Sequence, residues 1–190
     1  LFFEKPPPPE FGDRFVGRDG QSGAAFRVWE EDTAITSLGR PVVPSDSPLE
    51  DTATVTLWSR RDDPVRRRYT RWSVLAQVQV GPSSPVHDSY AMETLPSPVR
   101  LEKWGKYAVT MRVTNKPNLE NEYYKHWWKQ SQAAGCEGQV FGFDGAAYPQ
   151  HGPYSRKGYG VVNFGIRAND GCERRAMTCG DDHMCHTPAP

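Results

Sequence analysis

The sequence predicts a mainly β protein, either an antiparallel β-sandwich-like domain or a β-rich α+β domain. Valine (16) outnumbers leucine (8) and isoleucine (2), and β-branched residues of this kind favour strands. The chain also holds 17 glycines and 17 prolines, which favour turns and ordered loops. Several segments alternate apolar and polar residues with a period of two, as expected for strands with one buried face.

Six segments are predicted to be strands. The clearest is residues 69–80, in which apolar residues at every second position share one face: Trp72, Val74, Ala76, Val78 and Val80. The others are residues 24–29, 52–59, 99–114, 138–143 and 158–167. Two proline-rich stretches, residues 33–51 and 81–98, are predicted to be connections. The second is too long for a hairpin turn, so we expect it to cross the sheet or to form an excursion with its own packing.

One amphipathic helix is predicted for residues 118–134. Asn118 provides an N-cap, and Gly135 follows the last predicted turn as a terminator. At about 100° per residue the apolar side chains spread over about 180° of this helix, which is wider than one packing surface requires. We therefore expect either a helix covered on both sides or a helix with one aromatic edge facing outward.

The predicted organisation is one globular domain with an extension at each end. Residues 1–23 are predicted to be an extended arm, because four consecutive prolines from Pro6 to Pro9 favour a polyproline helix. Residues 24–172 form the β-rich domain, and residues 173–190 form a C-terminal tail. We expect the arm to be a stiff spacer along its own domain, with docking on a neighbouring protein as the alternative.

Four cysteines lie in the last third of the chain, at Cys136, Cys172, Cys179 and Cys185. An even count and the absence of a Cys-x-x-Cys pair favour two disulfides, and the preferred pairing is Cys136–Cys172 with Cys179–Cys185. Disulfides would place the protein in an oxidising compartment, either outside the cell or in an organelle lumen. The alternative is four reduced thiols in a reducing compartment.

Charge and hydropathy exclude several classes of protein. The 23 basic and 23 acidic residues give a formal net charge of zero, whereas a nucleic-acid-binding domain usually carries a basic excess. No segment approaches the roughly 18 apolar residues of a membrane span. The first residues lack the charged and apolar regions of a signal peptide, so we expect a mature or trimmed chain. No cofactor motif is present, and we expect no cofactor.

The sharpest candidate site is a cluster of aromatic residues in the predicted helix and in a later glycine- and proline-rich loop. Its members are Tyr123, Tyr124, Trp127 and Trp128 on the helix, with Tyr148 and Tyr154 on the loop. Exposed Trp and Tyr side chains offer large, rigid surfaces to sugar rings or to apolar side chains of a partner. The alternative is that the helical aromatics form the core face of a helix lying on a sheet.

Two weaker candidates involve metal binding and hydrolysis. His183, Cys185 and His186 could bind zinc or copper, but a solvated turn closed by a disulfide is the preferred interpretation. Carboxylates and a histidine that could serve a glycosidase occur at Glu30, Glu31, Asp32, Asp144 and His151. No nucleophile, zinc-protease or phosphate-binding motif accompanies them.

The sequence therefore favours a non-catalytic binding or assembly module that contacts a protein partner or a glycan through an aromatic surface. An accessory structural subunit of a larger complex is the first alternative. A hydrolase acting on carbohydrate is the second.

Overall fold

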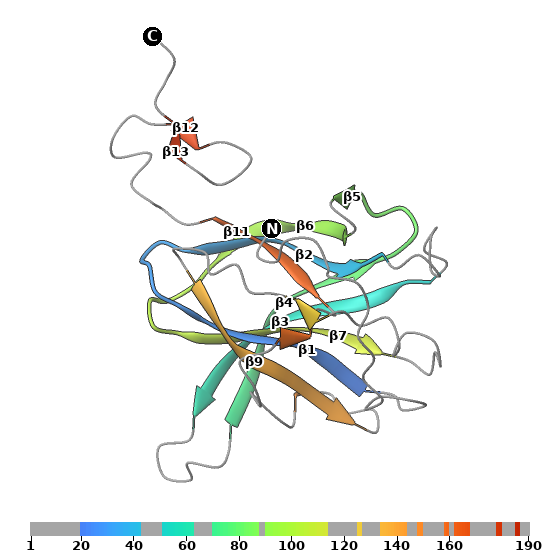
Figure 1. Cartoon of the computed structure of the whole chain (residues 1–190), viewed down its shortest axis with the longest axis horizontal. Coiled ribbons are helices and arrows are strands. Elements are labelled where there is room, and N and C mark those ends of the chain that lie inside the picture. Colours follow the sequence, from blue (N-terminus) through green and yellow to red (C-terminus); the bar gives the residue numbers. More distant parts are fainter. Residues whose placement is uncertain are drawn as a thin grey trace.

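The described part of the chain consists of β-strands and turns. A computed structural model describes residues 20–42, 51–62, 70–87, 90–113, 125–126, 134–143, 148–149, 158–159, 162–167, 178–179 and 185–186. Two antiparallel sheets account for most of these residues, and the described residues include no helix (Figure 1). The predicted mainly β class is confirmed.

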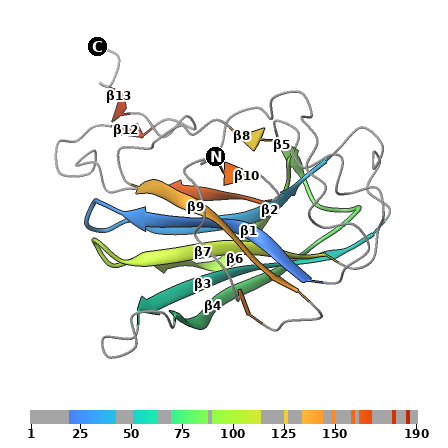
Figure 2. The same cartoon turned by 60° about the horizontal axis from the view of Figure 1, so that its bottom comes forward.

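The larger sheet has five strands in the order β4-β3-β7-β1-β9, which run side by side in Figure 2. All neighbours in it are antiparallel. The strands are β1 (Gly20–Val28), β3 (Ala53–Asp62), β4 (Thr70–Val80), β7 (Lys106–Val113) and β9 (Ala134–Phe143).

The smaller sheet has four strands in the order β11-β2-β6-β5. They are β2 (Ala34–Pro41), β5 (Val86–His87), β6 (Tyr90–Arg100) and β11 (Asn163–Arg167). Two short pairs complete the described strands: β8 (Lys125–His126) with β10 (Gly158–Tyr159), and β12 (Thr178–Cys179) with β13 (Cys185–His186).

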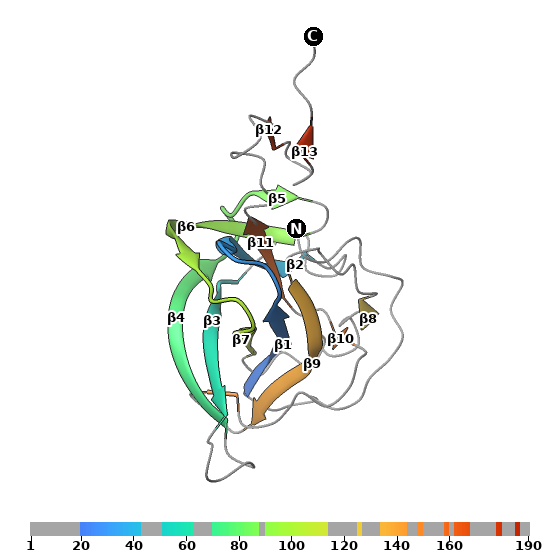
Figure 3. The same cartoon turned by 90° about the vertical axis from the view of Figure 1, so that its left-hand side faces the viewer.

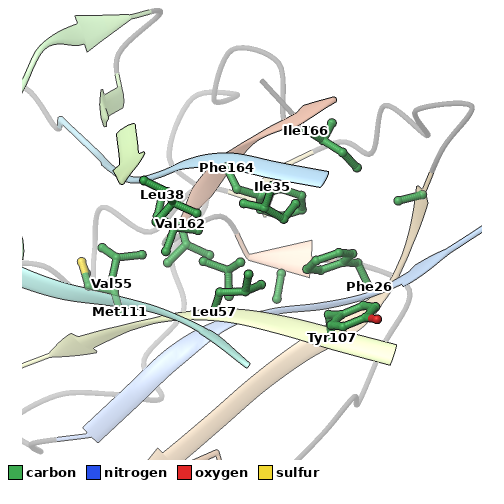
Figure 4. Close-up of a cluster of buried hydrophobic side chains, with 14 of the residues drawn as sticks. Phe26, Ile35, Leu38, Val55, Leu57, Tyr107, Met111, Val162, Phe164 and Ile166 are labelled. Carbon is green, nitrogen blue, oxygen red and sulfur yellow. The ribbon is translucent and has the colours of Figure 1, made fainter. Parts of the chain in front are cut away.

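The two sheets share one hydrophobic core. In Figures 1 and 3 the smaller sheet lies above the larger one, and Figure 4 shows side chains of both sheets meeting between them. Phe26 of β1 stacks on Phe164 of β11 with ring centroids 4.6 Å apart and packs at 5.7 Å against Tyr107 of β7. Phe26 and Phe164 are completely buried, and burying each such side chain contributes about 1.5–3 kcal/mol.

The outer face of the five-stranded sheet is also buried at its centre. Trp58 of β3 is 3% exposed, and its Nε1 donates a hydrogen bond of 2.8 Å to Oγ1 of Thr110 on β7. That hydroxyl donates in turn to Oε1 of Gln21 on β1, at 2.6 Å. A second apolar cluster therefore lies on this face, around Trp58 and the completely buried Ala25 and Ala108.

Five predicted segments correspond to the five strands of the larger sheet, with shifted ends, and residues 99–114 also include the end of β6 and the turn after it. The segment 158–167 divides into β10 and β11, which belong to different sheets. The short strands β5, β8, β12 and β13 were not predicted, and two long strands were missed. β2 and β6 fall in the stretches that were assigned to connections because of their prolines. In β6 the ladder to β2 passes from Thr94 to Val99, so Pro96 and Pro98 lie in an irregularity where no ladder N–H is needed. Proline content alone therefore misled the prediction.

The prediction of a single apolar face for residues 69–80 is wrong. Ala76 pairs with Leu57 but Val74 pairs with Trp58, so Leu75 is an extra residue in the ladder between β4 and β3. This bulge reverses the alternation. Ala76 and Val78 therefore pack on the shared core, whereas Trp72 packs on the outer-face cluster.

The predicted helix at residues 118–134 is wrong wherever the structure describes that segment. Lys125 and His126 form β8, and Ala134 begins β9. Tyrosine and tryptophan favour strands over helices, and pairing with β10 satisfies the backbone of β8. The other residues of the segment lie outside the described part of the chain.

The structure describes the strands that hold three of the four cysteines. Cys136 lies in β9, and the register of β12 and β13 places Cys179 opposite Cys185. The Cys179–Cys185 disulfide stays a prediction, and Cys172 lies outside the described residues.

Residues 1–19, which hold most of the predicted arm, also lie outside the described residues. Within the described residues, no helix has the length and apolar character needed to cross a membrane.

Truncating Phe26 should destabilise the protein strongly. We expect Phe26→Ala to lower the free energy of unfolding by about 3–5 kcal/mol, because it leaves a cavity between two aromatic neighbours. Urea denaturation of the full chain measures this change. Val74→Ala is the control: Val74 is 51% exposed, and its replacement should shift stability by less than about 0.5 kcal/mol. Equal effects of the two substitutions would contradict the assigned core.

Candidate functional site

Two turns lie side by side at one end of the molecule. Residues 29–33 join β1 to β2, and residues 101–105 join β6 to β7; in Figure 2 they are the blue and the yellow-green turns at the left. The amide of Trp104 donates to the carbonyl of Val28 at 2.7 Å, and the amide of Val28 donates to the carbonyl of Gly105 at 3.1 Å. The amide of Leu101 donates to the carbonyl of Thr33 at 2.8 Å. The pairing of neighbouring strands thus continues into both turns and fixes one against the other.

Trp104 has a strained backbone. Its φ is +64°, in the left-handed region that bulky side chains rarely adopt. It is the third residue of a turn closed by a 2.9 Å hydrogen bond from the amide of Gly105 to the carbonyl of Glu102. A positive φ at this position normally requires Gly or Asn. The other positive φ at a described non-glycine residue belongs to Asp32, a residue type that tolerates it better.

The strained turn displays an exposed aromatic surface. Trp104 is 61% exposed, the largest value among the exposed large apolar residues of the described part of the chain. Trp29 is half-buried beside it, with ring centroids 6.1 Å apart and an interplanar angle of 79°. This edge-to-face arrangement fixes the orientation of both rings. The Trp29 ring is therefore partly covered by protein, while most of the Trp104 ring faces solvent.

Charged residues accompany the two tryptophans in these turns. The ammonium of Lys103 lies 6.0 Å from the ring centroid of Trp104 and 3.6 Å from Oε1 of Glu31. The exposed carboxylates of the two turns belong to Glu30, Glu31, Asp32 and Glu102. We call the surface formed by these four residues with Trp29, Lys103 and Trp104 the tryptophan corner. Arg100 and Lys106 directly flank the second turn, so residues of both charges adjoin the tryptophan corner.

Tyr107 ties the tryptophan corner to the core. Its ring is 5% exposed and packs on Phe26, while its hydroxyl accepts a 2.8 Å hydrogen bond from the amide of Glu102. Burial raises the pKa of the Tyr107 hydroxyl above its usual value of 10.0. The turn also needs a glycine next to Trp104, because a Cβ on Gly105 would overlap the Tyr107 ring.

A second group of polar side chains has the geometry of a structural ion pair. Glu137 of β9 accepts from Arg27 of β1 at 2.5 Å and from Arg60 of β3 at 3.0 Å. The arrangement cross-links three strands of the larger sheet and supports a structural role.

Most of the predicted binding residues fall outside the described residues. These are Tyr123, Tyr124, Trp127, Trp128 and Tyr154. Tyr148 is described and is 52% exposed, as a contact residue would be. Of the acidic and basic candidates for hydrolysis, Glu30, Glu31 and Asp32 lie in the tryptophan corner. Asp144 and His151 lie outside the described part.

The structure does not describe the side chains of the predicted metal ligands. Cys185 and His186 lie in β13, whose side chains are not described, and His183 lies outside the described residues. Among the side chains that are described, no group of three or more His, Cys, Asp or Glu residues could hold a metal ion.

The prediction from sequence overlooked Trp29 and Trp104. A usable signal was present, because both tryptophans stand among charged residues, in Trp-Glu-Glu-Asp and in Glu-Lys-Trp-Gly. A tryptophan in a charged stretch without apolar alternation is a candidate for an exposed turn. Their proximity was not predictable, since 75 positions separate them in the chain.

Comparisons of the chain with models of protein families, with curated proteins and with solved structures find no match in any of the three. A function can therefore be argued only from the residues of this chain.

Glycine should be tolerated better than alanine at Trp104. We expect Trp104→Gly to be about 1 kcal/mol more stable than Trp104→Ala, because only glycine adopts a φ of +64° without strain. Urea denaturation of both variants measures the difference. The same pair of substitutions at Trp29, which has no positive φ, should give the opposite order. Alanine proving the more stable at Trp104 would contradict the strained backbone.

The raised pKa of Tyr107 should make stability depend on pH in the alkaline range. The folded protein holds the proton more tightly than the unfolded chain, so stability from the neutral hydroxyl is complete below pH 10. It is lost as the pH rises through the folded pKa. Below pH 10 we expect Tyr107→Phe to be about 1 kcal/mol less stable than the wild type, because it lacks the hydrogen bond to Glu102.

Urea denaturation of both proteins over a pH series tests this dependence. The advantage of the wild type should shrink above pH 10. Other tyrosines titrate in both proteins, so their contribution cancels in the difference. A difference that stays constant through this range would show that burial does not hold the proton on Tyr107.

Proposed function

We propose that this protein is a non-catalytic binding module that contacts a protein partner or a glycan through the tryptophan corner. One observation carries the proposal: a tryptophan that is 61% exposed occupies a left-handed backbone position. Both features lower the stability of the fold. A backbone of this kind costs roughly 1–2 kcal/mol for a residue other than glycine.

Neither feature helps the chain to fold. Glycine would close the same turn without strain, and a polar residue would suit the exposed position better. Strained residues and exposed apolar groups concentrate at sites of function, because selection for binding offsets their effect on stability. Trp104 therefore fits a residue retained for contact with another molecule.

The chemistry of the tryptophan corner suits binding. Indole rings present a large, rigid surface and lose little side-chain entropy when a ligand covers them. The network of hydrogen bonds between the two turns holds this surface in place before a partner arrives. Pre-organisation of this kind raises affinity, because fewer groups must be ordered on binding.

The scaffold and the compartment form part of the proposal. Two antiparallel sheets around one core support a β-sandwich as the scaffold. The register that sets Cys179 opposite Cys185 supports a disulfide, and with it a secreted or organelle-lumen location.

A second candidate function is that of an accessory structural subunit. Val74 (51%) and Leu75 (40%) are exposed on β4, the strand that forms one edge of the five-stranded sheet. Exposed apolar residues on an edge strand are typical of surfaces where another strand or subunit packs. This alternative predicts that binding depends on Val74 and Leu75 rather than on Trp104.

Replacing Trp104 should remove binding without unfolding the protein. We expect the labelled full chain to give signals on peptide and glycan arrays that fall at least tenfold in Trp104→Ala, as is common for a central aromatic contact residue. Val86→Ala is the matched control, because Val86 is also a highly exposed apolar residue (57%). Signals equal in Trp104→Ala and the wild type would contradict the proposal. Signals lost only in Val74→Ser and Leu75→Ser would favour the structural subunit.

A further inference from the structure

One edge of the five-stranded sheet is formed by a long strand with a partner on one side. β4 is the last strand on its side of the sheet, and among the described residues only β3 pairs with it (Figure 3). A strand in this position presents the N–H and C=O groups of its outer edge to whatever lies beside it. With 11 residues, β4 is long enough to pair with a full additional strand.

This edge lacks most of the features that keep the edge strands of different molecules apart. Charged side chains and prolines are common protections, but residues 72–80 contain neither. Of the usual protections, this part of the strand has only the bulge at Leu75. Ser73, Val74 and Leu75 are exposed one after another, Val74 at 51% and Leu75 at 40%. An apolar edge of this kind is a template for pairing with another strand.

Both apolar clusters are incompletely covered where they reach β4. Ala76 and Val78 pack on the shared core but are only half-buried, and Trp72 is half-buried beside the outer-face cluster. A strand added beside β4 would cover the flanks of these side chains. Removing that apolar surface from water favours the pairing.

The charge on β4 favours an antiparallel copy of the same strand as the partner. Its one charged residue, Arg71, stands near one end. Antiparallel pairing centred on Leu75 sets the Arg71 residues of the two copies about 20 Å apart, at about 3.4 Å per residue. That separation exceeds the screening length of about 8 Å in physiological salt. A parallel pair in register would place the two Arg71 side chains next to each other, where like charges destabilise pairing.

The same antiparallel arrangement keeps the two faces of the sheet matched. At the bulge, Val74 and Leu75 together occupy one step of the ladder. A twofold axis at that step sets Ser73 beside Ala76 of the second copy, and Trp72 beside Gln77 of the second copy. The residues of each pair share a face, because their own partners on β3 are separated by an even number of positions. The exposed Val74 and Leu75 of the two copies then meet at the axis.

We propose that this protein forms a twofold dimer in which β4 of one copy pairs antiparallel with β4 of a second copy. The pairing joins the two five-stranded sheets into one continuous sheet. A twofold contact uses the same surface on both copies, so the assembly closes at two. This inference goes beyond the proposed binding function, because it uses none of the residues of the tryptophan corner.

Sedimentation of the full chain at concentrations from about 1 μM to about 1 mM tests the dimer. We expect the mass to rise from 21.4 kDa to twice that value and to stop there. Leu75→Lys should weaken dimerisation at least tenfold, because it sets two ammonium groups together at the axis. Val86→Lys is the matched control: Val86 is 57% exposed but lies on β5 of the other sheet, so dimerisation should not change. A monomer at every concentration, growth beyond two copies, or equal effects of the two lysines would overturn the inference.

Oxidative cross-linking tests the position of the axis. Leu75→Cys should join two copies through a disulfide, because the two substituted residues meet at the axis and a disulfide needs Cα atoms within about 7 Å. Gln79→Cys should not, because the two copies of residue 79 lie about 27 Å apart at about 3.4 Å per residue. The wild type, with its four native cysteines, gives the background. Cross-linking of Gln79→Cys as strong as that of Leu75→Cys would contradict the antiparallel pairing.

Failure of this inference and failure of the proposed function give different results. Trp104→Ala should dimerise as the wild type does, and this outcome together with lost array signals would support both proposals. Array signals that depend on Trp104 in a protein that stays monomeric would overturn only the dimer. Dimerisation lost in Trp104→Ala but kept in Leu75→Lys would place the contact at the tryptophan corner and overturn the pairing of β4.

Discussion

The side chain of Tyr107 joins the core of this protein to the surface that we propose for binding. Its ring packs against Phe26 between the two sheets, and its hydroxyl accepts the amide hydrogen of Glu102 in the turn between β6 and β7. Gly105 of the same turn has no room for a side chain beside the ring. The position of Trp104 therefore follows from the packing of the core, through one phenol ring and one glycine.

Bulges decide which side chains each face of the larger sheet presents. Leu75 is the extra residue that turns Trp72 and Val74 away from the core, and Glu137 is the extra residue between Cys136 and Gly138 in the ladder to β1. The second bulge gives the Glu137 carboxylate two arginine partners on different strands. Each irregularity in pairing thus serves the packing of the outer face, which is as well buried at its centre as the inner one.

Stability and binding make opposite demands on the turn at Trp104. A glycine there would relieve the backbone, and a polar side chain would suit its exposure. The surrounding hydrogen bonds hold the residue in the strained conformation, so the indole ring keeps one orientation. A surface built in this way offers a partner a defined shape.

The sequence by itself determined the mainly β class and the existence of the five strands of the larger sheet, because alternation and β-branched composition act locally. It also set the charge of the two turns and the absence of a basic excess. It did not reveal that the proline-containing segment of β6 is a strand, since β6 accommodates Pro96 and Pro98 only through an irregularity in its pairing with β2. It did not determine the face of each side chain on β4, because a bulge depends on the partner strand.

Only the tertiary structure brought Trp29 and Trp104 together. The two residues are 75 positions apart, and they meet because β1 pairs with β7 and their turns share hydrogen bonds. Local pattern cannot encode such a contact, since strand order depends on the free energy of burying both sheets around one core.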